Sequence, residues 1–282
     1  MLRDIRELTD SPEEYAAELR RRWGGLLSYR YIGRKYAQMD LGPEDNTVPL
    51  RRDMRNTTGG LLFAVLGICA PESGHMSDLE AVPNPVIHSC QILDPGHDVT
   101  RIEIISEELR RGRQMGYSRA TIVDADRRDR VLALIEGQGV SIGTPPEGLE
   151  KMEANPLEVV DSPDLPPLWQ VFGGFRRDDG NWGLPELAVE VASPDAALHI
   201  GPQFVMLETA AIDAATTLAG TDRLQGVSTH VMFLARGKAG PFRLQTEPIS
   251  GPDGMVAVRV QMFDEGFDDR LTTVGSYQFR VV

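Results

Sequence analysis

The sequence predicts an α+β protein made of two similar halves, each with one buried helix followed by a run of antiparallel strands. Three observations support this fold class. Two segments half a chain apart resemble each other, the second has apolar residues at helical spacing, and the segments after both alternate between apolar and polar residues. The chain has 282 residues, 41% of them hydrophobic, which is enough for one large domain or two smaller ones.

The internal repeat holds a nearly constant shift along the chain. "TGGLLFAVLGICA" at 58–70 aligns with "HIGPQFVMLETAA" at 199–211, and "HSCQIL" at 88–93 aligns with "THVMFL" at 229–234, both at a shift of 141 residues. "DRVLALIEGQ" from Asp129 aligns with "DRLTTVGSYQ" from Asp269 at a shift of 140. Identity is low, but the register is kept to within one residue. We therefore interpret the chain as a tandem duplication.

A helix is expected to open each half. The first should start near Gly59 and stop at Pro71, because proline cannot continue a helix. The second has Pro202 in its first turn and Gly220 just past its end, the usual positions of these residues. Its apolar stripe, at spacings of three and four, predicts burial against a sheet and comprises Phe204, Leu207, Ala211, Ala214 and Leu218.

Four strand-like segments follow each predicted helix. In the first half they are "VIHSCQIL", "VTRIEIISEEL", "QMGYSRATIVDA" and "RVLALIEGQGVSI". In the second half they are "STHVMFLAR", "PFRLQTEPI", "MVAVRVQMF" and "LTTVGSYQFRVV", with "SGPDG" as a hairpin turn. Each set predicts an antiparallel meander that packs against the helix of its own half.

The remaining segments complete the expected domain organisation. Residues 1–34 are expected to be an N-terminal helical extension, with a helix over 12–23 that Ser11, Pro12 and two acidic residues introduce. A stretch rich in proline, glycine and aspartate predicts a linker. The expected order is therefore the extension, a first repeat domain over 35–145, a linker over 146–184 and a second repeat domain over 185–282.

Composition and charge argue against several classes of function. The formal net charge of -13 disfavours a nucleic-acid-binding protein, which needs a broad basic face. No apolar run approaches the roughly 18 residues of a membrane span, and the charged N-terminal segment lacks the pattern of a secretory signal. Cys69 and Cys90 lack the spacing of a zinc or redox motif, and the histidines form no ligand grouping. We therefore expect a cytoplasmic protein without a metal.

The start of the second helix carries a family resemblance. An "HIG" turn that opens a buried helix, an acid nine residues after its histidine and a strand meander resemble the hotdog-fold acyl-CoA thioesterases. The strands are similar to the phenylacetate-pathway type, and the duplication is similar to the double-hotdog type. The resemblance covers residues 35–145 and 185–282. It implies two tandem hotdog domains, each a long helix wrapped by an antiparallel sheet, that form a pseudo-dimer.

The resemblance also implies one active site divided between the halves. Glu208 occupies the position of the catalytic acid, whereas its counterpart in the first half is Gly67. The first half keeps the glycine turn instead, so the amides of Gly59 and Gly60, with the side chain of Asn56, are expected to bind the thioester oxygen. The acid would either activate a water or attack the carbonyl, and the sequence leaves both routes open. The mirror site, without an acid, is expected to be inactive.

Further residues are secondary candidates. Some double-hotdog enzymes combine an acid with a hydroxyl and a glutamine, which implicates Ser228, Thr229 and Gln278, and the helix motif adds His199 and Gly201. The segment "ELRRGRQMGYSR" concentrates positive charge that could bind the phosphates of coenzyme A, through Arg110, Arg111 and Arg113. The alternative for these arginines is a solvated hairpin tip.

The sequence therefore predicts a thioesterase that hydrolyses an acyl-CoA, with coenzyme A as part of the substrate and no other cofactor. One alternative is a hotdog enoyl-CoA hydratase, which would use Asp195 and His199 to add water to a double bond. The other is a double-hotdog protein without catalysis that binds acyl-CoA or acts as a scaffold. For Glu208 itself, the alternative is a carboxylate at the helix edge that faces solvent. The resemblance also leaves room for two chains to pair as a homodimer.

Overall fold

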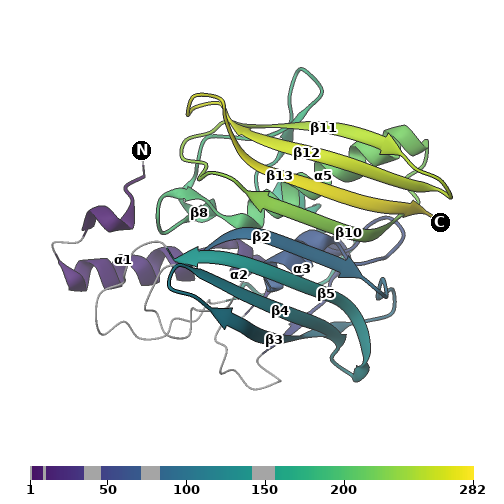
Figure 1. Cartoon of the computed structure of the whole chain (residues 1–282), viewed down its shortest axis with the longest axis horizontal. Helices are drawn as coiled ribbons and strands as arrows, with labels where there is room; N and C mark the ends of the chain where they lie inside the picture. Colours follow the sequence, from purple (N-terminus) through teal and green to yellow (C-terminus); the bar gives the residue numbers. More distant parts are fainter. Residues whose placement is uncertain (1, 9–10, 35–45, 71–82, 142–155) are drawn as a thin grey trace.

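One long antiparallel sheet curves around two helices (Figure 1). The computed structural model describes residues 2–8, 11–34, 46–70, 83–141 and 156–282. Within them the sheet has 11 strands in the order β1-β3-β4-β5-β2-β10-β13-β12-β11-β7-β6. The predicted α+β class, with antiparallel meanders that pack against helices, is confirmed at this level.

The first half begins with short helices and continues into four long strands. The N-terminal segment holds a 3-10 turn (Ile5–Leu8) and α1 (Pro12–Gly24). The elements that follow are α2 (Leu27–Ile32), β1 (Thr47–Pro49), a 3-10 turn (Arg52–Met54), α3 (Phe63–Cys69), β2 (Pro83–Ile92), β3 (Arg101–Arg111), β4 (Met115–Asp124) and β5 (Arg127–Ser141).

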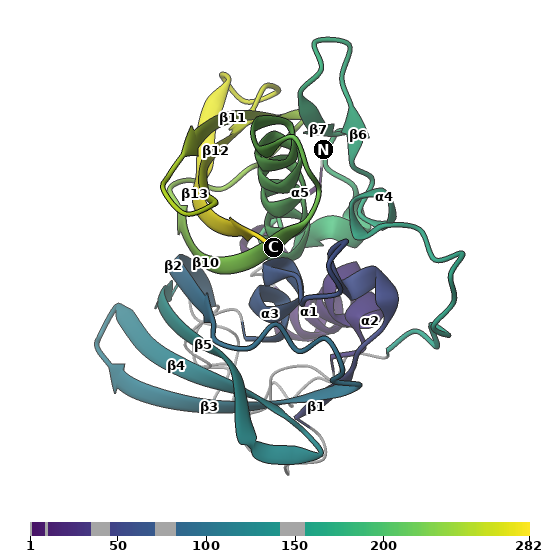
Figure 2. The ribbon, with the colours of Figure 1, turned by 90° about the vertical axis from the view of Figure 1, so that its right-hand side faces the viewer.

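The second half repeats this order around a longer helix. Its elements are α4 (Leu168–Val171), β6 (Phe175–Arg176), β7 (Trp182–Leu184), a 3-10 turn (Val189–Val191), β8 (Ala192–Ser193), β9 (Ala197–Leu198), α5 (Ile200–Ala219), β10 (Leu224–Phe233), β11 (Phe242–Ser250), β12 (Met255–Asp264) and β13 (Arg270–Val281). In the end-on view of Figure 2, β10 to β13 curve around α5, whose apolar side chains fill the concave face.

The two halves join where β2 pairs with β10. At this junction Ser89 lies opposite His230, and these residues are equivalent at the shift of 141. The neighbouring pairs, Cys90–Thr229 and His88–Val231, exchange with each other under the same shift. Deeper in the sheet, Ser89 faces Glu136 while His230 faces Ser276, so β5 and β13 correspond at a shift of 140. The strand pairing therefore follows both shifts that the sequence alignment predicts.

The two helices differ in how well they match expectation. The second begins and ends as predicted, with Pro202 in its first turn and Gly220 in the left-handed conformation at φ 67°. In its stripe, Phe204 is buried, but Leu218 in the last turn is 43% exposed. The first helix starts at Phe63 rather than near Gly59, so that boundary was wrong. The predicted stop at Pro71 lies outside the described residues.

The segment before each long helix also has a repeated structure. In the first half, α2 ends at Gly33 with φ 84°, and β1 then pairs with the edge of β3 that faces away from β4. In the second half, α4 is followed by Gly173 with φ 79°, and β7 pairs with the edge of β11 that faces away from β12. Residues 156–184 are therefore more than a simple linker. The expected domain limits near 35 and 145 fall in segments outside the described residues, so those limits stay predictions.

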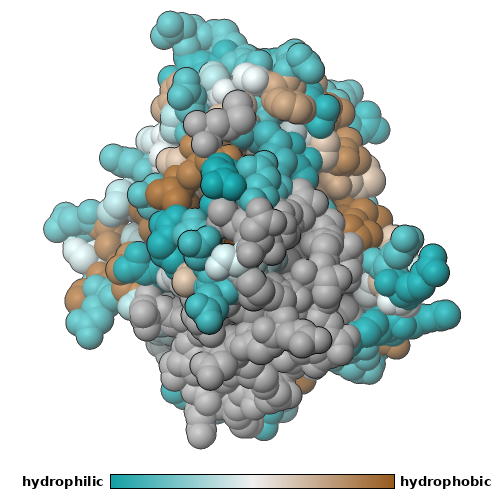
Figure 3. All heavy atoms as spheres, turned by 90° about the vertical axis from the view of Figure 1, so that its left-hand side faces the viewer, coloured by the Kyte–Doolittle hydropathy of each residue, from teal (hydrophilic) through white to brown (hydrophobic). Residues whose placement is uncertain are grey.

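Hydrophilic and hydrophobic residues are both exposed on the face that Figure 3 shows. Hydrophilic residues cover most of the described part of that face, with hydrophobic ones in smaller areas between them. Among the helices in the described ranges, none has both the length and the apolar character needed to cross a bilayer.

Candidate active site

Glu208 lies where the long helix α5 contacts the short helix α3. Its side chain projects from the middle of α5 and is only 3% exposed. The amide N–H of Phe63 donates to its Oε1 at 2.9 Å, and the amide N–H of Ala64 donates to its Oε2 at 2.7 Å. These are the first two residues of α3. The acid of the second half therefore caps the helix of the first half, and the alternative of a solvent-facing carboxylate is wrong.

Two opposing effects set the protonation of Glu208. Burial disfavours the charged form and raises the pKa of Glu208 to about 7, although the two amide hydrogen bonds act in the other direction. The partial positive charge at the start of α3 also favours an anion there. Near neutral pH the carboxyl group is consequently about half ionised. A pKa close to the working pH is the property that a general base or acid needs.

Side chains from the sheet surround the carboxylate. Burial raises the pKa of the Cys90 thiol, and the nearby charge of Glu208 raises it further. The same two causes, burial first, raise the pKa of the Tyr277 phenol well above its usual range. Tyr277 is 1% exposed and lies directly opposite Thr229 in the β10–β13 ladder. The hydroxyl of Thr229 is buried close to this phenol. A buried hydroxyl thus lies in the neighbourhood of the acid.

A cavity of about 570 Å³ opens beside Glu208. Its volume lies within the range of small-molecule sites. One wall is a face of α5 formed by Val205, Glu208, Thr209, Ile212, Asp213 and Thr216. An apolar wall comes mainly from the segment before β7 and consists of Pro163, Leu165, Pro167, Leu168, Trp169 and Trp182. A polar wall comes from the first half and the turn after α5, through Arg52, Asp53, Arg55, Asn56, Thr57 and Asp222.

The predicted oxyanion residues are near this cavity but already engaged. Asn56 lines it, with Oδ1 accepting from the amide of Gly60 at 2.9 Å and Nδ2 donating to the carbonyl of Leu224 at 2.9 Å. The amide of Gly59 donates to the backbone carbonyl of Asn56 at 3.0 Å. Asn56 therefore organises a turn that leads into α3. In this structure the amides that meet the acid are those of Phe63 and Ala64 instead.

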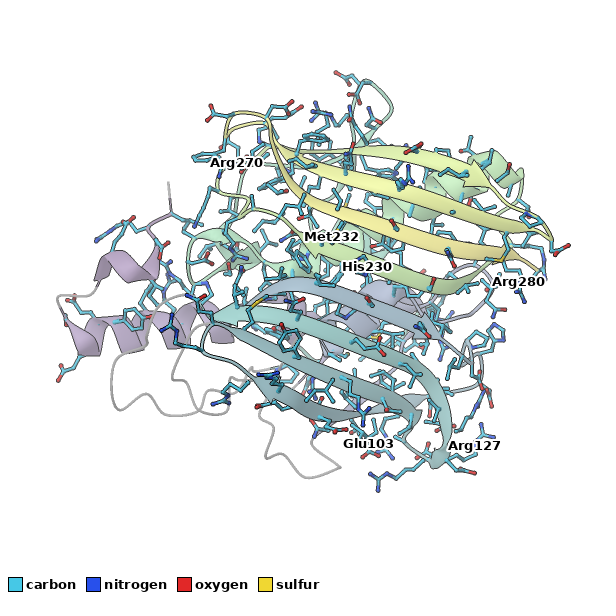
Figure 4. All side chains as sticks on the ribbon, viewed as in Figure 1. Glu103, Arg127, His230, Met232, Arg270 and Arg280 are labelled. Carbon is cyan, nitrogen blue, oxygen red and sulfur yellow. The ribbon has the colours of Figure 1, made fainter. Side chains whose placement is uncertain are left out.

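Strand geometry separates the secondary candidates. Along a strand, successive side chains point to opposite faces, so Thr229 and Ser228 cannot face the same side. Thr229 is buried on the inner face, whereas the Ser228 hydroxyl donates to Gln278 Oε1 at 3.0 Å on the exposed outer face. Figure 4 shows His230 and Met232 on β10 beside β2, and they share the outer side with Ser228. The structure therefore places Thr229 near Glu208 but directs Ser228 and Gln278 away.

His199 and Gly201 belong to the start of α5. The amide of Gly201 donates to His199 Nδ1 at 3.2 Å, and the Ser28 hydroxyl lies 2.9 Å from the same nitrogen. Burial, followed by the nearby charge of Arg236, lowers the pKa of His199 to about 3, so the ring is neutral at ordinary pH. His199 thus acts as a helix cap. Neither residue lines the cavity beside Glu208.

The arginines expected to bind phosphate form a separate feature. Arg110 and Arg113 line an open hollow of about 670 Å³ at the β3–β4 hairpin, together with Tyr117. Arg111 pairs with Glu108 at 3.5 Å. None of them lines the Glu208 cavity. Arg52 and Arg55 line the Glu208 cavity instead, and no sequence pattern pointed to them.

Gly67 occupies the mirror position of Glu208, and an aromatic ring fills the space beside it. A Cβ atom added to Gly67 would lie 3.0 Å from the ring of Phe204. Gly67→Ala is therefore expected to lower the free energy of unfolding by about 1 kcal/mol through crowding. Thermal unfolding of the variant and of wild type checks this. An unchanged or raised stability would show that the Phe204 ring moves aside without cost.

No group of three or more histidine, cysteine, aspartate or glutamate side chains in the described ranges has the arrangement of a metal site. The free thiols Cys69 and Cys90 are both buried, and burial raises the pKa of the Cys69 thiol to about 11. The polar side chains that line the cavity carry carboxylate, guanidinium, amide and hydroxyl groups.

Solved structures share this architecture at low sequence identity. An acyl-CoA thioesterase II, TesB2, from Mycobacterium marinum aligns over 86% of this chain and 96% of its own, with a TM-score of 0.58 and 15% identity. The chain has the hotdog fold of such thioesterases. The tesB protein of Mycobacterium avium subs paratuberculosis covers 87% of this chain and 96% of its own at a TM-score of 0.57 and 12% identity. A 12:0-ACP thioesterase from Umbellularia californica covers 83% and 92% at a TM-score of 0.54 and 9% identity.

Sequence comparisons add no closer relationship. No protein-family model matches the chain, and no curated protein matches it by sequence. The resemblance to hotdog thioesterases is thus confirmed through the fold, and the roles of single residues rest on the geometry of the site.

Proposed function

We propose that the protein is a thioesterase that hydrolyses an acyl-CoA thioester at one site formed between two tandem hotdog halves. The observation that carries this proposal is the contact between the Glu208 carboxylate of α5 and the first amides of α3, at the edge of a cavity. An acid with a pKa of about 7 and helix N–H donors beside it are the groups that thioester hydrolysis requires.

The pseudo-dimer part of the proposal is supported by the strand register. The β2–β10 pairing is symmetric under exchange of residues 141 apart, as expected when two copies of one unit pair through the same edge. The two copies have diverged at the acid, with Glu208 in one and Gly67 in the other. One working site and one inactive mirror site follow from that difference.

The reaction can be written with the groups present. The thioester oxygen takes one of the two amides at the start of α3 while Glu208 keeps the other, and the helix dipole stabilises the developing oxyanion. Glu208 removes a proton from a water molecule, whose oxygen attacks the carbonyl carbon. The tetrahedral intermediate then expels the thiolate of coenzyme A, which takes up the proton. A carboxylic acid and a free thiol result.

A second route fits the same geometry, in which the Glu208 carboxylate attacks the thioester carbonyl and displaces the thiolate of coenzyme A, and water then attacks the Glu208 carbonyl of the mixed anhydride and releases the acid. A single turnover in isotopically labelled water separates the routes. In the first, the label goes directly into the product acid. In the second, the product oxygen of the first turnover comes from Glu208.

The pH dependence of the reaction is expected to report Glu208. Because the ionised form is the active one, kcat/KM should rise with pH through an apparent pKa of about 7 and level off above it. Initial rates of thiol release, measured over a series of pH values, check this. A profile that is flat across neutral pH would show that another group is the base.

The hydratase alternative finds less support in the structure. Burial alone would raise the pKa of Asp195, but Arg236, in an ion pair at 2.6 Å, and the Ser193 hydroxyl lower it below its usual range. Neither Asp195 nor His199 lines the cavity. Both are committed to the loop and cap at the start of α5.

A panel of thioesters tests the proposed function. Acyl-CoAs of increasing chain length, aryl-CoAs, enoyl-CoAs and an acyl carrier protein thioester are offered to the protein, and free thiol and loss of the double bond are followed separately. Thiol release supports the proposal, and double-bond loss without thiol release supports the hydratase. Binding without turnover would identify a non-catalytic protein. Pairing of two chains stays a prediction, which the molar mass in solution would test.

A further inference from the structure

We propose that Trp169, on α4, sets the size limit of an apolar acyl group bound beside Glu208. This inference rests on the proposed function, because it assigns the apolar part of the same cavity to the acyl chain. It concerns a segment that the sequence predicts to be only a linker.

The walls of the cavity differ in polarity and so orient a substrate. Five apolar residues of the segment 163–169 face α5, whereas the residues from 52–57 on the other wall are mostly polar or charged. An acyl chain gains free energy by leaving water for the apolar wall. The polar pantetheine arm of coenzyme A is then directed to the 52–57 side.

The apolar wall begins close to the acid. The cavity-lining residues of α5 recur at spacings of three and four, so they form one face of the helix. Ile212 follows Glu208 by four residues, about 6 Å along the helix axis. In Figure 2, α4 lies on the side of α5 that the strands β10 to β13 leave uncovered. An acyl carbon chain that extends from a carbonyl at Glu208 would therefore meet α4 after a short distance.

Trp169 is held in place by a chain of contacts that returns to α5. Its ring lies 5.0 Å from that of Trp182, at an angle of 60°. The guanidinium of Arg176 lies over Trp182 at 4.3 Å and forms an ion pair with Asp213 of α5. Trp169 is therefore part of a braced wall, and a braced indole limits the space available to a ligand more sharply than a freely moving side chain would.

The first half shows what happens when the equivalent short helix leaves no space. There α2 precedes the left-handed Gly33 as α4 precedes Gly173. Ser28 of α2 packs directly on the start of α5, and a Cβ atom added to Gly201 would lie only 2.0 Å from its hydroxyl. The cavity of about 570 Å³ lies instead beside α4, where Leu168 and Trp169 line it together with Ala64 of α3. The position and side chains of the short helix thus decide how much ligand fits.

The experiment compares Trp169→Ala and Trp169→Phe with wild type over a series of straight-chain acyl-CoAs. For each protein, kcat/KM of the longest hydrolysed chain is divided by kcat/KM of the shortest. We expect Trp169→Ala to raise this ratio by about tenfold or more, since one methylene in a hydrophobic pocket changes kcat/KM by about that factor. Trp169→Phe should fall between wild type and the alanine variant. The matched control is Phe175→Ala, which truncates a 39% exposed aromatic residue of the same segment outside the cavity.

Binding to a variant that cannot turn over gives an independent readout. In a Glu208→Gln background, the dissociation constants of the same acyl-CoAs are measured with and without Trp169→Ala. A change in chain-length preference in either measurement supports the assignment. An unchanged preference in both the alanine and phenylalanine variants overturns it. Absence of hydrolysis by wild type, together with a Trp169-dependent binding preference, would reject the thioesterase and retain the acyl wall.

Discussion

Glu208→Gln is expected to lower kcat for thioester hydrolysis by about 10²–10⁴-fold, the usual contribution of a general base. Glutamine keeps the length of the side chain and can still accept a hydrogen bond from Phe63 or Ala64, but it cannot take a proton from water or attack a carbonyl. The loss should appear in kcat more than in KM, because this substitution leaves the size of the cavity that is proposed to hold the acyl group unchanged.

The matched control for this variant is Glu107→Gln. Glu107 is exposed on the outer face of β3, where Arg119 donates to it at 2.9 Å. An exposed ion pair contributes little to stability, so this variant should retain full activity. Rates for wild type and both variants are measured with thermal unfolding of each. Undiminished hydrolysis in Glu208→Gln would show that Glu208 is a structural cap and that the catalytic group lies elsewhere.

The stability of the protein is expected to depend on pH through the same residue. The pKa of Glu208 is about 7 in the folded protein against an ordinary value of 4.5. The folded state therefore binds the proton more tightly than the unfolded state. The stabilising contribution is fully present below about pH 4.5 and is lost as pH rises through about 7. Between pH 5 and 8 the loss is about 2–3 kcal/mol.

Wild type alone would not reveal this effect clearly. Burial also lowers the pKa of His88 to about 4 and that of His199 to about 3, so these residues make the protein more stable as pH rises through the same range. Both histidines are unchanged in Glu208→Gln. The difference in unfolding free energy between variant and wild type therefore isolates Glu208.

The measurement is denaturant unfolding of both proteins at pH 5 and pH 8. Relative to wild type, Glu208→Gln should become more stable by about 2–3 kcal/mol on going from the lower to the higher pH. Parallel curves, with a constant difference, would mean that the folded protein does not raise the pKa of this carboxyl.

Much of the site could be predicted because the repeat fixes which positions correspond. Aligning the halves placed Glu208 opposite Gly67 and pointed to a site shared by two helices, and the carboxylate does reach the first turn of α3. The motif alone would have directed attention to His199. The comparison of copies directed it to the acid, because Gly67 in the first half has no side chain that could replace the carboxylate.

The backbone amides that donate to Glu208 were not predicted from the sequence. The glycine turn implied that α3 begins at Gly59, but the Asn56 side chain uses the early amides to close a turn, and the helix starts four residues later at Phe63. Likewise Gln278 has the expected residue type on the wrong face of its strand, while its neighbour Tyr277 points inward. Shifts of one residue in a strand, or four in a helix, are below what a weak alignment resolves.

The sequence by itself predicted the internal repeat and the antiparallel meanders and showed the asymmetry between Glu208 and Gly67, because periodicity and spacing are properties of the chain itself. Only the tertiary structure decided which amides meet Glu208, that burial raises its pKa, and that α4 forms one wall of the cavity. Those features depend on residues distant in the chain and on how much water their packing excludes. A local sequence pattern shows neither the distant contacts nor the exclusion of water.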